Sequence, residues 1–152
     1  MQIEKNHLLT KQLHSIINDE TNRIANLSNA SALLFEHLDN INWAGFYLWD
    51  KEDRELVLGP FQGKVACIRI NSGSGVCGTA FEKEETVVVP DVNEFPGHIV
   101  CDAASQSEIV IPLIKEGEKI GVLDIDAPIK NRFSPDDKSM LEEFVSVLLN
   151  HI

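Results

Sequence analysis

The residues best suited to chemistry in this sequence are its three cysteines, Cys67, Cys77 and Cys101. Cys101 lies within residues 91–107, a stretch without helical or strand periodicity, and loops of that length in a compact domain are often functional. A thiolate is a nucleophile, and two neighbouring thiols can form and exchange a disulfide. The pattern therefore predicts thiol or redox chemistry, although for any single cysteine a buried, unreactive thiol is the more ordinary explanation.

The same cysteines could instead bind zinc together with His98, because thiolates and imidazoles are zinc ligands. The spacing argues against this: Cys67 and Cys77 are ten residues apart, Cys77 and Cys101 are 24 apart, and no CxxC pair occurs. We therefore expect no metal site. His98 precedes Cys101 by three residues and could shift the pKa of that thiol or hold the loop in place; the sequence leaves both roles open.

Two acidic residues, Asp124 and Asp126, occur inside the apolar stretch GVLDIDAP. Residues i and i+2 of a strand point to the same face, so both carboxylates share a face with Val122, while Leu123 and Ile125 point to the other face. An ionised carboxylate in a buried strand is costly unless it meets a cation, hydrogen-bond donors or a shared proton. The alternative is a solvated strand edge or strand end, because such charges are usually exposed.

Further residues of the same kind predict a single pocket. Glu108 opens the apolar stretch EIVIPLI, and Trp43 and Tyr47 lie four residues apart in a β-rich stretch, which places both rings on one face. Three carboxylates beside a loop thiol and two aromatic rings would bind a cationic group such as an ammonium. Close carboxylates also raise one another's pKa, which keeps one of them protonated as a catalytic acid.

The elements that must position these side chains follow from the hydrophobic pattern. Helical periodicity predicts a pair of helices over about residues 5–38, interrupted near 18–22, and a C-terminal helix over about 135–151 with Ser134 as its N-cap. A further short helix follows a Gly-rich segment. Because parallel βαβ alternation is absent, we predict an α+β fold with an antiparallel central sheet within about 41–127 and helices packed on one of its faces. The predicted strands are 42–50, 55–60, 65–70, 86–89, 107–114 and 119–128.

Length and charge restrict the classes of function. The chain has 152 residues and a formal net charge of 13 − 24 = −11, which predicts one domain over residues 1–152 and argues against binding to nucleic-acid phosphates or to an anionic membrane. No apolar run approaches the roughly 18–20 residues that cross a bilayer, and the N-terminal segment lacks a signal-peptide pattern. An odd, small number of cysteines does not make a secreted disulfide framework, so we expect a cytoplasmic protein.

Five motifs carry a resemblance that extends from about Leu27 to Phe133. They are NWAGFYL, LVLGPFQGKVACIRI, GVCGTA, VPDVNEFPGHIVCDAASQSEIVIPL and GVLDIDAP. Together they resemble the free methionine-(R)-sulfoxide reductases, which are built on a GAF domain. The resemblance implies a single GAF-type domain and an oxidoreductase that repairs oxidative damage by reducing the R epimer of free methionine sulfoxide, without a bound cofactor.

The resemblance also implies roles for the three cysteines. Cys101 matches the catalytic thiol, which attacks the sulfoxide sulfur and becomes a sulfenic acid. Cys67 matches the main resolving partner, which forms a disulfide with Cys101, and Cys77 matches a second thiol that can take part or act as the nucleophile in some members. Thioredoxin, or another external dithiol, reopens the disulfide. Members of this family are commonly homodimers.

The pocket residues have counterparts in the same family. Glu108, Asp124 and Asp126 match its acidic substrate-site residues, with Glu108 or one of the aspartates as the proton donor, and Trp43 and Tyr47 match its aromatic wall. Two other classes of function stay open at this point. One is a GAF module that binds a small molecule without turnover, and the other is a thiol redox sensor or transient zinc binder that uses the same cysteines.

Overall fold

The computed structural model describes the backbone of residues 2–99, 101 and 103–152, and the side chains from residue 8 onward within these ranges. Its helical elements are α1 (Gln2–Ile17), α2 (Arg23–His37), α3 (Gly75–Lys83), the 3-10 turn η1 (Val92–Glu94) and α4 (Pro135–Leu149). Its strands are β1 (Trp43–Asp50), β2 (Glu55–Gly63), β3 (Arg69–Asn71), β4 (Val87–Val89), β5 (Ser107–Lys115) and β6 (Glu118–Ala127).

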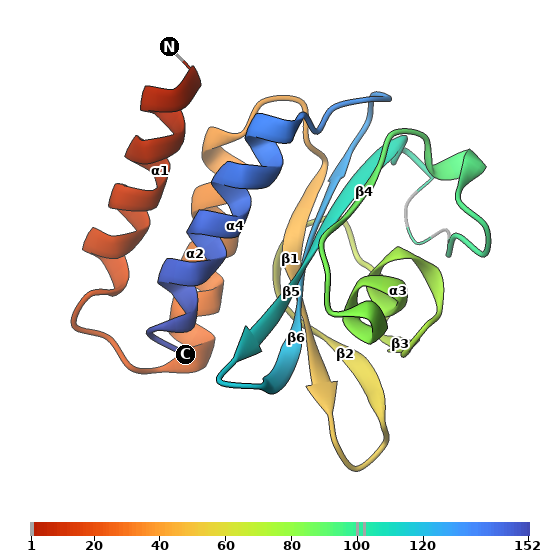
Figure 1. Cartoon of the computed structure of the whole chain (residues 1–152), viewed down its shortest axis with the longest axis horizontal. Helices are drawn as coiled ribbons and strands as arrows, with labels where there is room; N and C mark the ends of the chain where they lie inside the picture. The colour runs from red at the N-terminus through yellow and green to blue at the C-terminus, as the bar shows by residue number, and fades with distance from the viewer. Residues whose placement is uncertain (1, 100, 102) are drawn as a thin grey trace.

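The described strands form a six-stranded antiparallel sheet in the order β3-β2-β1-β6-β5-β4 (Figure 1). The prediction of an α+β fold with an antiparallel central sheet is confirmed. The helical pair is interrupted where expected, because Asn22 caps α2 by accepting a hydrogen bond from the N–H of Ala25. Among the described residues, no helix combines the length and the apolar content that crossing a membrane requires.

One face of the sheet is covered by α2 and α4, and α1 packs against these two helices (Figure 1). The strands turn every second side chain toward this layer. Leu123 and Ile125 of β6 lie in it, opposite to Asp124, as the alternation predicted. The fully buried large side chains of this core include Phe46, Leu113, Leu123, Ile125, Leu141 and Phe144.

The opposite face of the sheet is covered by α3, which corrects the prediction that the helices pack on one face. Val76, Cys77 and Phe81 of this helix lie in a second apolar cluster with Val110 and Val122 of the sheet. The physical reason lies in the strands themselves. β5 is apolar at consecutive positions, so both of its faces need cover.

The segment between β2 and β3 also differs from the prediction. A strand was expected over residues 65–70, but β3 begins only at Arg69, and β2 continues to Gly63. Val65 is 89% exposed and Ile68 is 67% exposed, so these two apolar residues of the predicted strand do not pack into the sheet. Residues 64–68, which include Cys67, link β2 to β3 as an irregular segment that we call the strap.

Strand register brings the predicted pocket residues together. Asp126 of β6 lies between Trp43 of β1 and Glu108 of β5, and Asp124 is the register partner of Gly45 and Val110. Gly45 has no side chain for a steric reason, since a Cβ there would collide with Cβ of Phe61 on β2. The site therefore depends on three neighbouring strands in the middle of the sheet.

Candidate functional site

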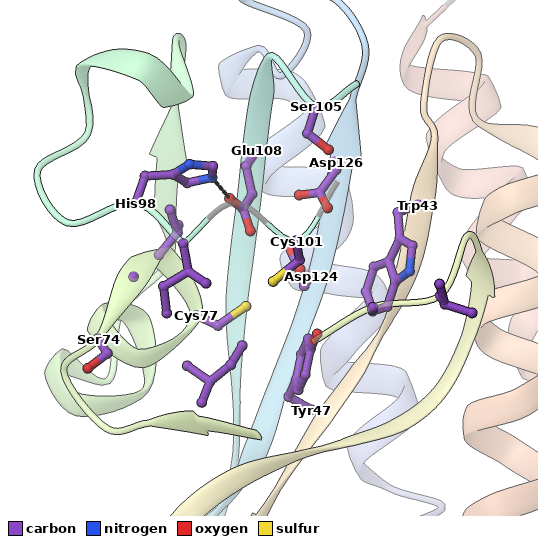
Figure 2. Close-up of a pocket in the computed structure, with 16 residues that line it drawn as sticks. Trp43, Tyr47, Ser74, Cys77, His98, Cys101, Ser105, Glu108, Asp124 and Asp126 are labelled. Atoms are coloured by element: carbon purple, nitrogen blue, oxygen red, sulfur yellow. Dashed lines mark ion pairs between the residues drawn. The ribbon is translucent and has the colours of Figure 1, made fainter. Parts of the chain in front are cut away.

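A pocket lies between the sheet, α3, the strap and the loop before β5 (Figure 2). Seven of the eight predicted site residues line it, and the eighth, Cys67, is joined to one of the seven by a disulfide. The long loop predicted over residues 91–107 contains the turn η1 near its start. Beyond this turn, the loop supplies His98, Ile99 and Cys101 to the pocket lining. The predicted residues at the pocket are Trp43, Tyr47, Cys77, Cys101, Glu108, Asp124 and Asp126.

The disulfide joins Cys67 of the strap to Cys101 of the loop, with 5.5 Å between their Cα atoms. This is the pair that the family resemblance implied. Both residues are partly exposed, so the bond lies at the mouth of the pocket rather than in the core. The zinc site that the sequence allowed would need Cys67, Cys77, Cys101 and His98 as ligands. In the disulfide form, Cys67 and Cys101 are not available as thiolate ligands.

The two acids deepest in the pocket are Glu108, which is 6% exposed, and Asp124, which is 5% exposed. Burial raises the pKa of Glu108 well above its usual value, and the charge of Asp126 raises it further. Burial likewise raises the pKa of Asp124, with the charge of Glu108 as the next cause. Carboxyl groups placed in this way hold their protons to a higher pH than exposed carboxyl groups do.

Asp124 also has an unmet hydrogen bond. Its Oδ1 atom is buried and has no hydrogen-bond partner among the described residues. A buried oxygen without a donor is costly, and in a pocket a ligand that brings an N–H or O–H group can remove that cost.

Cys77 on α3 is a free, buried thiol. Burial raises its pKa well above the usual value, and the charge of Asp124 acts in the same direction. Since the thiolate is the reactive form, a raised pKa opposes nucleophilic attack by this thiol. Its Sγ and one carboxylate oxygen each from Glu108 and Asp124 lie within 4.8 Å of one another, so these three residues could together hold a metal ion, which the sequence did not indicate.

Trp43 and Tyr47 form the aromatic wall of the pocket, and both are almost fully buried. Their rings stack with centroids 5.9 Å apart, and Trp43 also stacks on Phe61 at 5.1 Å. Burial raises the pKa of Tyr47, which keeps its hydroxyl protonated. Trp43 Nε1 donates a hydrogen bond to the carbonyl oxygen of Lys64 at 3.1 Å, and the Tyr47 hydroxyl donates to that of Cys67 at 2.9 Å.

His98 faces Glu108 across the pocket (Figure 2). Its Nε2 lies 3.7 Å from Oε1 of Glu108, which is too long for a direct hydrogen bond. Burial lowers the pKa of His98, so the ring is neutral at pH 7. Sequence reasoning did not single out the Ser105 side chain, which lines the pocket and accepts a hydrogen bond from Asn42 Nδ2 at 3.2 Å; a lone loop serine carries no signal that could have found it.

Comparison with known proteins places this geometry in a family. The GAF domain profile matches residues 25–151. A protein of Escherichia coli named free methionine-R-sulfoxide reductase is 51% identical over 140 residues, which cover 92% of this chain and 84% of the relative. A solved structure of fRMsr from Staphylococcus aureus in complex with substrate has a TM-score of 0.91 and 54% identity, and the match covers 96% of this chain and 94% of that one.

A second solved structure agrees with the first. The free methionine-R-sulfoxide reductase of Neisseria meningitidis, in complex with its substrate, has a TM-score of 0.93 and 45% identity, and the match covers 96% of this chain and 87% of that one. Identities of this size over almost the whole chain exceed what a shared fold alone would give. The chain therefore belongs to the GAF-domain family and, within it, to the free methionine-R-sulfoxide reductases.

Proposed function

We propose that this protein is an oxidoreductase that reduces free L-methionine-(R)-sulfoxide to methionine. The observation that carries the proposal is the Cys67–Cys101 disulfide at the mouth of a pocket lined by buried acids. A disulfide in that place is the expected oxidised product of a two-thiol reductase. Relatives about half identical over most of the chain bear the name of this activity.

The pocket suits a small ligand with a positive charge. The ammonium group of a free amino acid would donate to the buried Oδ1 of Asp124, which lacks a donor among the described residues, and would be attracted by the charge of Asp126. A methionine sulfoxide within a polypeptide has no ammonium group, and it would leave the buried Oδ1 of Asp124 without this donor. Sites that hydrogen-bond a particular group discriminate strongly against substrates without it, so free substrate is preferred. The aromatic wall would pack against the apolar part of the substrate.

The reaction begins with both thiols reduced. The Cys101 thiolate attacks the sulfoxide sulfur, and the sulfoxide oxygen is protonated as it is transferred; Glu108 suits the role of donor because its raised pKa keeps it protonated. Methionine leaves, and Cys101 carries the oxygen as a sulfenic acid. Cys67 then attacks the Cys101 sulfur, a disulfide forms and water is released. The buried, neutral Cys77 is less suited to either thiol role.

The proposal also includes an external reductant, a homodimeric assembly and a cytoplasmic location. An external dithiol must reduce the disulfide to start a new turnover, and thioredoxin is the partner that the family resemblance implies. A homodimer and a cytoplasmic location are proposed on the same resemblance, the second also because reduced thiols persist in that compartment. No cofactor is needed, since both electrons come from the two thiols.

The proposal is tested by turnover of single epimers. Purified protein with dithiothreitol is given free methionine-R-sulfoxide or the S epimer, and released methionine is measured. We expect turnover of the R epimer, and its loss in Cys101→Ser. Absence of turnover of either epimer by folded, reduced protein would reject the reductase. Binding of the sulfoxide without consumption would then identify a ligand-binding GAF module.

A further inference from the structure

The strap that carries Cys67 is only weakly anchored by its own apolar side chains, of which the small Ala66 packs against the second apolar cluster. Val65 and Ile68 are largely exposed, and the strap lies outside the sheet ladder between Gly63 and Arg69. A chain segment held by neither burial nor strand pairing samples many conformations unless other contacts restrict it. The disulfide fixes Cys67 in the oxidised protein, and once this bond is reduced the position of Cys67 depends on other contacts.

Two buried side chains of β1 supply those contacts. The Trp43 Nε1–H donates to the carbonyl oxygen of Lys64, and the Tyr47 hydroxyl donates to the carbonyl oxygen of Cys67 itself. At the far end of the strap, the N–H of Leu58 donates to the carbonyl oxygen of Ile68 at 2.8 Å. These hydrogen bonds all go to backbone carbonyl oxygens of the strap, and the one from Tyr47 goes to the carbonyl oxygen of Cys67.

The two donors are themselves rigid. Trp43 is 3% exposed and Tyr47 is 2% exposed, and both stand on a central strand in one aromatic stack with Phe61. Figure 2 shows Trp43 and Tyr47 together on the side of the pocket that faces the acids. A hydrogen bond from a fixed, buried donor restricts its acceptor more than one from a mobile surface side chain, because less conformational freedom remains to be lost.

From this arrangement we propose that Tyr47 is a positioning residue for disulfide formation: its hydroxyl holds Cys67 within reach of Cys101 after the disulfide has been reduced, with Trp43 as a second tether. This inference rests on the proposed function only for the step that it serves. In that step Cys67–SH attacks Cys101–SOH, the S–S bond forms, the S–O bond breaks, and the thiol proton leaves with the hydroxyl as water. The same aromatic wall would then contact substrate on one side and order the resolving thiol on the other.

The direct test measures the positioning of the two thiols without substrate. Protein is equilibrated with mixtures of reduced and oxidised glutathione, and the effective concentration of Cys67 relative to Cys101 is obtained from the fraction of disulfide, identified by mass spectrometry. Tyr47→Phe keeps the ring and removes only the hydroxyl. Loss of one hydrogen bond of ordinary strength predicts an effective concentration about five- to tenfold lower than in the wild type.

Two further variants serve as comparison. Trp43→Phe removes the other donor and should lower the effective concentration in the same direction. Phe61→Leu disturbs the same aromatic stack but removes no donor to the strap, and should leave the effective concentration within twofold of the wild type. A variant that merely loosens the fold weakens the oxidised and reduced forms alike and leaves this equilibrium unchanged, so the readout separates positioning from general stability. Melting curves of both forms verify folding.

The outcomes distinguish this inference from the proposed function. Equal effective concentrations in Tyr47→Phe and wild type would overturn the inference, whether or not the protein reduces methionine sulfoxide. A fall in Phe61→Leu as large as in Tyr47→Phe would also overturn it, because the stack rather than the hydroxyl would then matter. If the wild type shows no turnover but Tyr47→Phe still lowers the effective concentration, the positioning role of Tyr47 is supported and only the proposed reductase activity is rejected.

Discussion

Glu108 and Asp124 carry carboxyl groups that are buried, where ionisation costs free energy because the charge loses its contact with water. Both lie on the pocket face of central strands, beneath α3, and burial raises the pKa of each. A group whose pKa is higher in the folded than in the unfolded protein binds more protons when folded. Its contribution to stability is therefore full below the unfolded pKa and is lost as the pH rises toward the folded pKa.

Removing one of these acids should make stability less dependent on pH. For Glu108 the relevant window begins near the ordinary pKa of 4.5 and extends upward to the raised one. We expect the melting temperature of Glu108→Gln, relative to that of the wild type, to rise between pH 5 and pH 8, because the variant no longer has a buried group to ionise. Thermal melts across this range check the expectation. Parallel pH profiles for the two proteins would contradict it.

The buried oxygen of Asp124 leads to a prediction about substrate affinity. Asp124→Asn keeps the size of the side chain but removes one acceptor oxygen and the negative charge that the carboxylate carries when an ammonium group binds beside it, so the interaction with that group weakens. Hydrogen bonds to charged groups contribute about 1.5–3 kcal/mol, which corresponds to a rise in KM for free methionine-R-sulfoxide of roughly ten- to a hundredfold. Steady-state kinetics measure the effect. An unchanged KM and kcat would exclude the ammonium role of Asp124.

At the scale of single elements, α4 is a helix whose start is determined by the local sequence. Ser134 accepts a hydrogen bond from the N–H of Asp137, and the Asp137 carboxylate accepts from the N–H of Ser134 and from Arg132. This capping box fixes where the helix starts and therefore which of its residues face the sheet. Met140, Leu141 and Phe144, among others, then close the core beneath β5 and β6, the strands that carry all three acids.

Loss of this cap should weaken the whole fold by a modest amount. Ser134→Ala removes the side-chain acceptor of the cap, and caps of this kind contribute about 1 kcal/mol to the free energy of unfolding. Chemical denaturation would reveal the change as a lower midpoint with an unaltered slope. Ser146→Ala on the exposed side of α4 is the matched control and should have a smaller effect. Equal effects of the two substitutions would argue against the cap.

At the scale of the whole molecule, the disulfide links two segments that the sheet alone does not hold together. The strap follows β2 at one edge of the sheet, and the loop of Cys101 precedes β5 near the other. The two cysteines are 34 residues apart in sequence. Closing a loop of that size restricts the unfolded chain, and this lowers the entropy gained on unfolding.

The oxidised protein should therefore be more stable than the reduced protein. A loop of this length predicts a difference in the free energy of unfolding of about 3–4 kcal/mol. The melting temperature should fall when a reductant is added, and Cys67→Ser should melt like the reduced wild type under either condition. Cys77 lies outside the disulfide, so Cys77→Ser should keep the response to reductant. If reductant has no effect on wild-type melting, the bond does not constrain the folded protein in this way.

Much of the fold and most of the pocket could be predicted from sequence, because both depend on local patterns. The period of two in GVLDIDAP placed Asp124 and Asp126 on one face, and the structure confirms this with Leu123 and Ile125 on the other. The motif that opens α4 likewise predicted its start at residue 135. These features involve neighbours within a few residues of one another, where backbone geometry leaves few alternatives.

What only the tertiary structure decided involves contacts between distant segments. The strap looked like a strand because Val65 and Ile68 are apolar, but it lies outside the strands. It is held by side-chain donors from β1 and by one backbone hydrogen bond from Leu58 of β2. The placement of α3 on the second face of the sheet, the unmet oxygen of Asp124 and the burial that raises its pKa are likewise absent from any local pattern. Sequence spacing determines which way a side chain points along its own strand or helix, whereas burial and hydrogen-bond partners depend on which other elements pack against it.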